Sequence, residues 1–243
     1  MNTALILAAG IDPAFQMDIP KQFVVVENIP IIVYTLQAFQ LHPQIDQIIV
    51  SCLHGWKEMV LAYAKQFNIS KLIGIVEGGI DAQESSWKGI EWLSRRGTVE
   101  KEIVVVHDAI RPLVTADLIS DSIRVCKEYG MGVAAVRSMD TIMLTQDGET
   151  GRESISRYDF RRIQTPQAYR LGYLREMHQR AMKKQLSHSV DNNSMIAKLG
   201  ETIHFSKGSD FNIKINTVED VEMFKALYHM KRKTEEKAEA VHR

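Results

Sequence analysis

Short apolar runs alternate with segments of helical periodicity through the first 136 residues, and this alternation restricts the possible folds more than any other feature. Apolar side chains at helical spacing predict helices over residues 31–40, 58–67, 84–93 and 116–129. Short apolar runs predict buried strands over residues 5–9, 45–50, 71–76, 103–106 and 132–136. Such alternation is typical of a mainly parallel sheet covered on both faces, so we expect an α/β fold.

The pattern changes after residue 136. Asp147-Gly148 is a hairpin signal between residues 142–144 and Ile155, so we expect an antiparallel arm over about residues 138–164. Further helices are predicted over residues 171–184 and 218–230, and short strands over residues 203–205 and 212–215. We expect a single domain over residues 1–230, which is within the usual size of one α/β domain. Residues 231–243 are highly charged, which predicts a frayed helix or a solvated tail.

Charge and cysteine content narrow the classes of partner. Thirty basic residues balance 30 acidic ones, so we do not expect the protein to bind nucleic acid through its net charge. The apolar run at the N-terminus is too short for a signal peptide or a membrane span, which predicts a cytoplasmic protein without a membrane partner. Cys52 and Cys126 lack the spacing of metal ligands, and we expect two buried free thiols.

Glycine-rich and charged motifs follow the predicted strands. Ligands of open parallel sheets bind beyond the carboxyl ends of the strands, so the loops after Ala9, Val76 and Val106 should share one edge. In chain order, the motifs are Leu7-Ala8-Ala9-Gly10 with Pro20-Lys21-Gln22-Phe23, Gly78-Gly79 with Ser85, His107-Asp108-Ala109-Ile110-Arg111-Pro112, Asp140-Thr141, Arg157 with Gln164-Thr165-Pro166-Gln167, and Asn212-Ile213-Lys214-Ile215. Together they resemble the cytidylyltransferases of methylerythritol phosphate and ribitol phosphate over roughly residues 4–230. Each motif alone is weak evidence, whereas six in this order are strong.

The resemblance implies a Rossmann-like nucleotidyltransferase fold of the GT-A kind and an enzyme that joins CMP from CTP to a polyol phosphate. In such a reaction an acceptor phosphate oxygen attacks the α-phosphorus of CTP and pyrophosphate leaves. Catalysis then rests mainly on positioning and on electrostatic stabilisation. The resemblance also implies Mg²⁺ or another divalent cation, a role in isoprenoid or in teichoic acid and cell-surface polysaccharide synthesis, and a homodimer in which the arm embraces the second subunit.

The site residues that the resemblance implies divide by the chemistry they supply. The residues expected to contact CTP are Ala8, Ala9, Gly10, Gly79 and Ser85. Lys21 and Lys214 would be the catalytic cations, and Asp108 would hold the metal ion. The residues expected to bind the acceptor and its phosphate are Arg111, Thr141, Arg157 and Thr165.

These side chains also have ordinary structural interpretations. Lys21 could be a surface lysine, Asp108 a hydrogen-bond acceptor in a loop, and Arg111 an ion-pair partner of Asp108. Arg157 lies near Arg152, Arg161 and Arg162, as in a solvated basic face, although its spacing from Thr165-Pro166-Gln167 favours a site. His107 is more typical of a packing residue than of a metal ligand.

The chain departs from the family pattern almost entirely on the CTP side. Asp12 and Ala14 stand where the family has a glycine and an arginine, Pro13 lies between them, and Ala82 replaces a second arginine. The loss of cations and of a backbone donor predicts weak CTP binding.

Two functional hypotheses follow from these departures. One is a cytidylyltransferase with a rebuilt triphosphate loop, in which Gln16 or Gln83 takes over lost contacts. The other is an impaired family member that binds a polyol phosphate or pairs with an active relative. The segment Leu53-His54-Gly55-Trp56 resembles a motif of the ribitol branch, which favours ribitol 5-phosphate slightly over 2-C-methyl-D-erythritol 4-phosphate.

Overall fold

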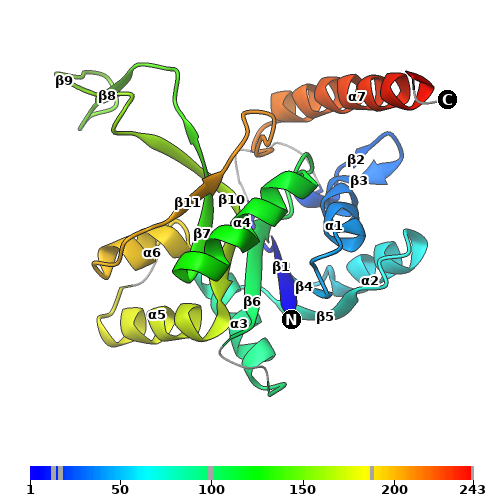
Figure 1. Ribbon diagram of the computed structural model, residues 1–243, viewed down its shortest axis with the longest axis horizontal. Coiled ribbons are helices and arrows are strands. Elements are labelled where there is room, and N and C mark those ends of the chain that lie inside the picture. The colour runs from blue at the N-terminus through cyan, green and yellow to red at the C-terminus, as the bar shows by residue number, and fades with distance from the viewer. Residues whose placement is uncertain (12–14, 16–18, 98–100, 187–188, 242–243) are drawn as a thin grey trace.

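A seven-stranded mixed sheet forms the centre of the computed structural model, which describes residues 1–11, 15, 19–97, 101–186 and 189–241 (Figure 1). In sheet order, the strands are β11 (Phe205–Lys207), β7 (Met131–Arg137), β10 (Arg161–Arg170), β6 (Ile103–Asp108), β1 (Asn2–Ala8), β4 (Gln47–Cys52) and β5 (Leu72–Glu77). Strand β10 runs antiparallel to its neighbours, β6 and β7, whereas the other pairs of this sheet are parallel. The prediction of an α/β fold with a mainly parallel sheet is confirmed.

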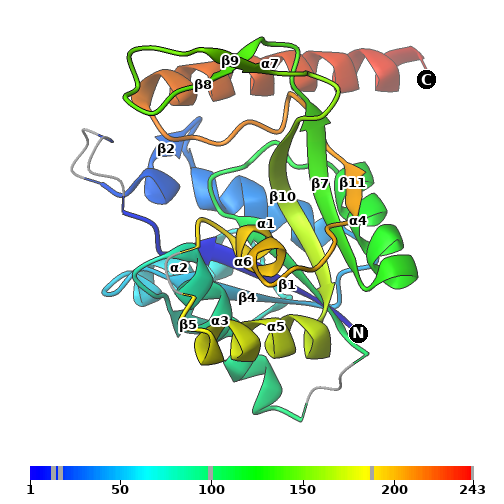
Figure 2. The same ribbon diagram turned by 90° about the vertical axis from the view of Figure 1, so that its left-hand side faces the viewer.

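Helices cover both faces of the sheet. One face carries α1 (Ile31–Leu41), α2 (Lys57–Gln66) and α4 (Ala116–Tyr129), and the other carries α3 (Ala82–Ser94), α5 (Leu171–Lys183) and α6 (Asn192–Lys198). In Figures 1 and 2, α1 and α2 lie on the opposite side of the strands from α5 and α6. Successive strand side chains point to opposite faces, so Ala4 and Ile6 pack with the first group and Leu5 packs with the second.

A third apolar cluster joins the two ends of the chain. It combines residues near the short helix η1 (Lys21–Phe23) and the hairpin of β2 (Val25–Val26) and β3 (Ile29–Pro30) with the start of α7 (Val218–Val241). Ile215 and Phe224 are fully buried in this cluster. Because α7 continues through Val241, helix extends into the charged segment that follows residue 230.

The arm carries a separate two-stranded ribbon, β8 (Ile142–Leu144) paired antiparallel with β9 (Glu153–Ile155). The predicted hairpin between residues 142–144 and Ile155 is confirmed. In its loop the Asp147 carboxylate accepts backbone N–H groups of Glu149 and Thr150 at 3.0 and 2.8 Å. Figure 1 shows the ribbon extending away from the sheet, on the opposite side from the free end of α7.

Several elements differ from the sequence predictions. Residues 161–170, which span the predicted end of the arm, form strand β10, and a register irregularity between Ile163 and Gln167 accommodates Pro166. Residues 212–215 form no strand, because they make isolated hydrogen bonds and no strand ladder. One of these bonds is donated by the Ile215 N–H to the Ile110 carbonyl at 3.0 Å. The strand predicted at 203–205 occupies Phe205–Lys207 instead. None of the helices in the described ranges is both long and apolar enough to cross a membrane.

Candidate active site

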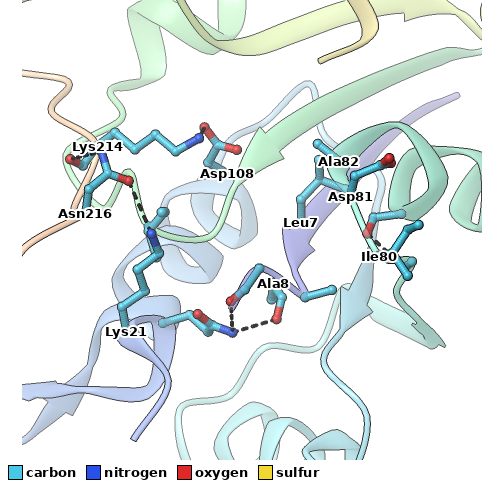
Figure 3. Close-up of a pocket in the computed structure, with 15 residues that line it drawn as sticks. Leu7, Ala8, Lys21, Ile80, Asp81, Ala82, Asp108, Lys214 and Asn216 are labelled. Atoms are coloured by element: carbon cyan, nitrogen blue, oxygen red, sulfur yellow. Dashed lines mark hydrogen bonds and ion pairs between the residues drawn. The ribbon is translucent and has the colours of Figure 1, made fainter. Parts of the chain in front are cut away.

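The first cavity, of about 200 Å³, lies beyond the carboxyl ends of β1, β5 and β6 (Figure 3). Its lining comes from segments far apart in the sequence: residues 7–10, 21–22, 79–82, 85, 108, 110, 214 and 216. The register of the sheet brings these segments together, because Leu7 pairs with Asp108 of β6 and Ala8 pairs with Cys52 of β4. The loops after the strands therefore meet at one edge, as the sequence predicts.

Helix η1 places Lys21 in this cavity. The ring of Phe23, the last residue of η1, stacks on Trp56 with ring centroids 4.3 Å apart. Gln22 donates its side-chain N–H to the Ala8 carbonyl at 2.9 Å, which ties η1 to the end of β1. Lys21 is 7% exposed, and its ammonium donates to the Asn216 side-chain oxygen at 3.2 Å. Lys21 is therefore a buried residue of the cavity wall and not an ordinary surface lysine.

The glycine loop after β5 forms the opposite wall. A Cβ at Gly78 would collide with the Cβ of Ala9, so the loops after β1 and β5 can approach this closely only with glycine there. The Gly79 N–H donates to the Ser85 hydroxyl at 2.9 Å, and Asp81 caps α3 by accepting the Glu84 N–H at 2.8 Å. These hydrogen bonds hold the wall against the start of α3.

Asp108, at the end of β6, is the charged centre of the site. Its carboxylate oxygen Oδ2 lies 3.2 Å from the ammonium of Lys214 and 3.1 Å from Nε of Arg111. Burial alone would raise the pKa of Asp108, but Lys214 and Arg111 outweigh that effect and hold the pKa below its usual value. The carboxylate is therefore ionised at neutral pH. Arg111 also donates to the Asn212 carbonyl at 2.8 Å, which anchors the segment that carries Lys214.

A second cavity of about 140 Å³ adjoins the first, and both are lined by Leu7, Ala82, Asp108 and Lys214. The remainder of its lining includes Arg111, Gln164, Thr165, Gln167, Asp191 and Asn192. Thr165 accepts the Asp108 N–H on its hydroxyl at 3.1 Å, and its carbonyl accepts the side chain of Asn212 at 2.7 Å. The two cavities therefore meet at Asp108 and Lys214.

Metal-binding groups are sparse in this region. Within the described part of the chain, no group of three or more His, Cys, Asp or Glu side chains could hold a metal ion. His107 is fully buried beside the ring of Phe39, and burial lowers its pKa to about 4. Charged side chains that line the first cavity among the described residues are Lys21, Lys214, Asp81 and Asp108, which sum to no net charge.

The structure brings together most residues that the sequence indicated. Those lining the first cavity are Ala8, Ala9, Gly10, Lys21, Gly79, Ser85, Asp108 and Lys214, while Arg111 and Thr165 line the second. Thr141 and Arg157 lie on the arm, both exposed, and line neither cavity. The substituted loop residues Asp12, Pro13 and Ala14, together with Gln16, lie outside the described residues. Gln83 does not line the first cavity: its side chain donates a hydrogen bond to the Leu186 carbonyl and accepts one from the Ser189 N–H.

Sequence reasoning missed several residues of the site. Gln22 stands out in the sequence only as part of a motif, although it ties η1 to β1. Asp81, Asn216 and Asp191 line the cavities and carry no motif that singles them out. Asp81 and Asp191 each begin a helix by accepting a backbone N–H three residues later, and that capping position is a signal that could have located them.

Comparison with known proteins identifies the family to which this chain belongs. The family model of 2-C-methyl-D-erythritol 4-phosphate cytidylyltransferase (IspD) matches residues 2–230. A ribitol-5-phosphate cytidylyltransferase of Lacticaseibacillus paracasei is 40% identical over 228 residues, which cover 93% of this chain and 97% of the relative. A 2-C-methyl-D-erythritol 4-phosphate cytidylyltransferase of Clostridium botulinum is 33% identical over 220 residues, 90% of this chain and 94% of the relative.

Solved structures agree with the sequence comparison. The 2-C-methyl-D-erythritol 4-phosphate cytidylyltransferase of Francisella tularensis superposes with a TM-score of 0.78 at 26% identity, covering 93% of this chain and 100% of that one. The enzyme of Thermus thermophilus gives a TM-score of 0.73 at 27% identity, covering 93% and 98%. The chain therefore belongs to the IspD family of polyol-phosphate cytidylyltransferases, a family of nucleotidyltransferase enzymes.

Proposed function

We propose that the protein transfers CMP from CTP to ribitol 5-phosphate and releases pyrophosphate. The observation that carries this proposal is the meeting of two cavities at Asp108 and Lys214. The first cavity, with the backbone of residues 8–10, Gly79 and the hydroxyl of Ser85, suits a nucleotide. The second, with Arg111 and Thr165, suits a phosphate that carries hydroxyl groups. Substrates bound in both would bring their phosphates together at the junction.

The lysines supply the positive charge that this transfer needs. An acceptor phosphate oxygen attacks the α-phosphorus while the bond from that phosphorus to the bridging oxygen breaks, and its electron pair leaves with pyrophosphate. Lys214, at the junction, would stabilise negative charge on the transferring group, and Lys21 would do so from the nucleotide side. We assign both as catalytic residues, and Arg111 and Thr165 as acceptor ligands.

The residues at the junction fit a magnesium ion. Mg²⁺ sites of nucleotide enzymes commonly use one or two carboxylates together with substrate phosphates and water. Asp108 is one such carboxylate, and Lys214 and Arg111 keep its pKa low, so that it is ionised when substrates bind. When bound, Mg²⁺ would neutralise phosphate charge and orient the oxygens of the triphosphate.

The choice of ribitol 5-phosphate rests on sequence similarity. The chain is more similar to the Lacticaseibacillus paracasei enzyme, named for ribitol 5-phosphate, than to the Clostridium botulinum enzyme, named for 2-C-methyl-D-erythritol 4-phosphate. Pyrophosphate release should be measured with CTP, Mg²⁺ and each acceptor in turn. Turnover with ribitol 5-phosphate well above that with the other acceptor is the expected result, and the reverse preference would overturn the acceptor assignment.

We also propose a homodimer in which the arm of one chain completes the acceptor site of the other. Thr141 and Arg157 are exposed on the arm and line neither cavity of their own chain. An isolated two-stranded ribbon is only marginally stable in water, so the β8–β9 ribbon needs a partner surface. Light scattering at micromolar concentration should give the mass of two chains. A monomer mass would contradict this arrangement.

A specific observation supports a second candidate, an impaired family member that binds a polyol phosphate without turnover. Ala82 lines both cavities at the position where the resemblance expects an arginine, so that wall offers no cation at this residue. Calorimetry with ribitol 5-phosphate, combined with the pyrophosphate assay, separates the two candidates. Binding of ribitol 5-phosphate without pyrophosphate release from CTP would favour the impaired family member.

We further propose that residues 1–230 act as one domain in the cytoplasm. Cys52 and Cys126 are both buried as free thiols, which suits a reducing compartment. Limited proteolysis of the folded protein should leave a fragment that ends near residue 230 and keeps its nucleotide affinity.

A further inference from the structure

Asn216 lies between the two lysines of the proposed reaction. Figure 3 shows Lys21 and Asn216 reaching toward each other, from η1 and from the segment before α7. The Lys21 ammonium donates to the Asn216 side-chain oxygen at 3.2 Å. At its other end, the Asn216 amide donates to the carbonyl of Lys214 at 3.4 Å. A donor thus faces a carbonyl and an acceptor faces an ammonium, so the amide orientation agrees with both neighbours.

The backbone beneath Asn216 is firmly held. Its N–H and that of Thr217 donate to the Asp220 carboxylate at 2.8 and 2.9 Å, and the Asp220 N–H donates back to the Thr217 hydroxyl at 3.3 Å. This reciprocal arrangement is a capping box at the start of α7. On the other side, the fully buried Ile215 donates its N–H to the Ile110 carbonyl at 3.0 Å. Asn216 therefore presents its amide from a rigid base.

A neutral acceptor on a rigid base suits the needs of a catalytic lysine. The lysine stem has several rotatable bonds, so its ammonium must be fixed before it can stabilise a transition state efficiently. An ammonium has three donors, and the amide oxygen of Asn216 accepts one of them. The amide of Asn216 carries no charge and does not cancel that of Lys21, as a carboxylate at the same place would.

We propose that Asn216 is a positioning residue that holds Lys21 in the orientation required for transfer of the CMP group. This inference rests on the proposed function for its kinetic readout. It assigns a role to a side chain outside the residues singled out from the sequence. It also gives a role to the segment before α7, which is far from β1 in the sequence and lines the first cavity through Lys214 and Asn216.

Two variants of similar shape separate positioning from a merely structural role. Asn216→Leu removes the acceptor, and we expect kcat to fall about 10-fold to 100-fold, with KM for the polyol phosphate changed by less than about twofold. Asn216→Asp keeps an acceptor but places a negative charge beside Lys21, so we expect KM for CTP to rise at least about fivefold. Val218→Ala is the control, since its side chain is 42% exposed two residues away, and its kinetic constants should match those of the wild type.

Calorimetry with CTP distinguishes failure of this inference from failure of the proposed function. If wild-type protein binds CTP but shows no turnover, the proposed function is wrong, and Asn216 is judged by binding alone. Weaker CTP binding by Asn216→Asp than by the wild type, with similar thermal midpoints, then supports the inference. Wild-type kinetics in Asn216→Leu, or wild-type CTP affinity in Asn216→Asp, would overturn it.

Discussion

Gly78→Ala tests whether the close approach of the loops after β1 and β5 shapes the first cavity, the proposed CTP site. The new Cβ would collide with the Cβ of Ala9, and it would lie 3.3 Å from both the Cys52 carbonyl oxygen and the Ser51 hydroxyl. The Gly78 N–H also donates to that carbonyl at 2.8 Å, so the loop cannot simply swing aside without losing a hydrogen bond.

The size of the effect follows from the overlap. Non-bonded carbon atoms pack at about 3.5–4.0 Å, so the two loops must separate by roughly 1 Å or more. A displacement of that size near reacting groups can cost about 10²-fold in rate. Overpacking of this kind also costs about 1–3 kcal/mol in the free energy of unfolding. We therefore expect kcat/KM for CTP to fall by about 10-fold to 100-fold.

Two further variants show whether the Ala9 contact is the cause. Ala9→Gly combined with Gly78→Ala removes the colliding atom and should restore most of kcat/KM for CTP. Gly132→Ala introduces a comparable collision, with the Ser122 carbonyl between β7 and α4, and should lower stability without lowering kcat/KM of the folded enzyme. Steady-state kinetics with denaturant unfolding measures both quantities. A double variant as impaired as the single one would refute the explanation.

Three other predictions concern charge. Asp108→Asn should lower turnover by about 10²-fold or more. It should also lower the free energy of unfolding by about 1–3 kcal/mol, because Lys214 loses its countercharge. Kinetics across Mg²⁺ concentrations measure the first effect, and denaturant unfolding measures the second. Burial lowers the pKa of His107 and His178 to about 4, so the unfolded chain takes up protons first as the pH falls below about 6.5. Unfolding free energy should therefore drop by roughly 2 kcal/mol per histidine between pH 7 and pH 5, and His178→Gln should remove part of that drop. Arg157→Ala should weaken binding of the polyol phosphate and leave CTP affinity nearly unchanged; calorimetry showing the opposite pattern would contradict its assignment to the acceptor.

Periodicity predicted the parallel part of the fold because each central strand is apolar over most of its length. Strand β10 escaped prediction because Pro166 cannot donate to a ladder, and the sequence does not reveal that an irregularity would accommodate it. Helix α6, with only the residues Asn192–Lys198, was not predicted because a segment this short contains barely two turns of periodicity.

The motifs predicted the site to the extent that its residues follow strands. The loop that carries Lys21 and the residue Asp108 converge because β1 and β6 end at the same edge, which follows from parallel pairing. Lys214 joins them through the hydrogen bonds that tie its neighbours Asn212 and Ile215 to Arg111 and Ile110. Asn216 could not be predicted in this way. Its place depends on how α7 packs against the β2–β3 hairpin, which is a tertiary contact between the two ends of the chain.

The charges around the first cavity bear on how a triphosphate could bind there. Lys21 and Lys214 balance Asp81 and Asp108 among the described lining residues, whereas CTP brings about four negative charges at neutral pH. Binding therefore needs positive charge or backbone donors beyond these four side chains. A divalent cation at Asp108 would supply two charges and offset its carboxylate. CTP affinity in this protein should accordingly depend strongly on Mg²⁺, since the uncharged Ala82 lines the cavity at the position where the family pattern has an arginine.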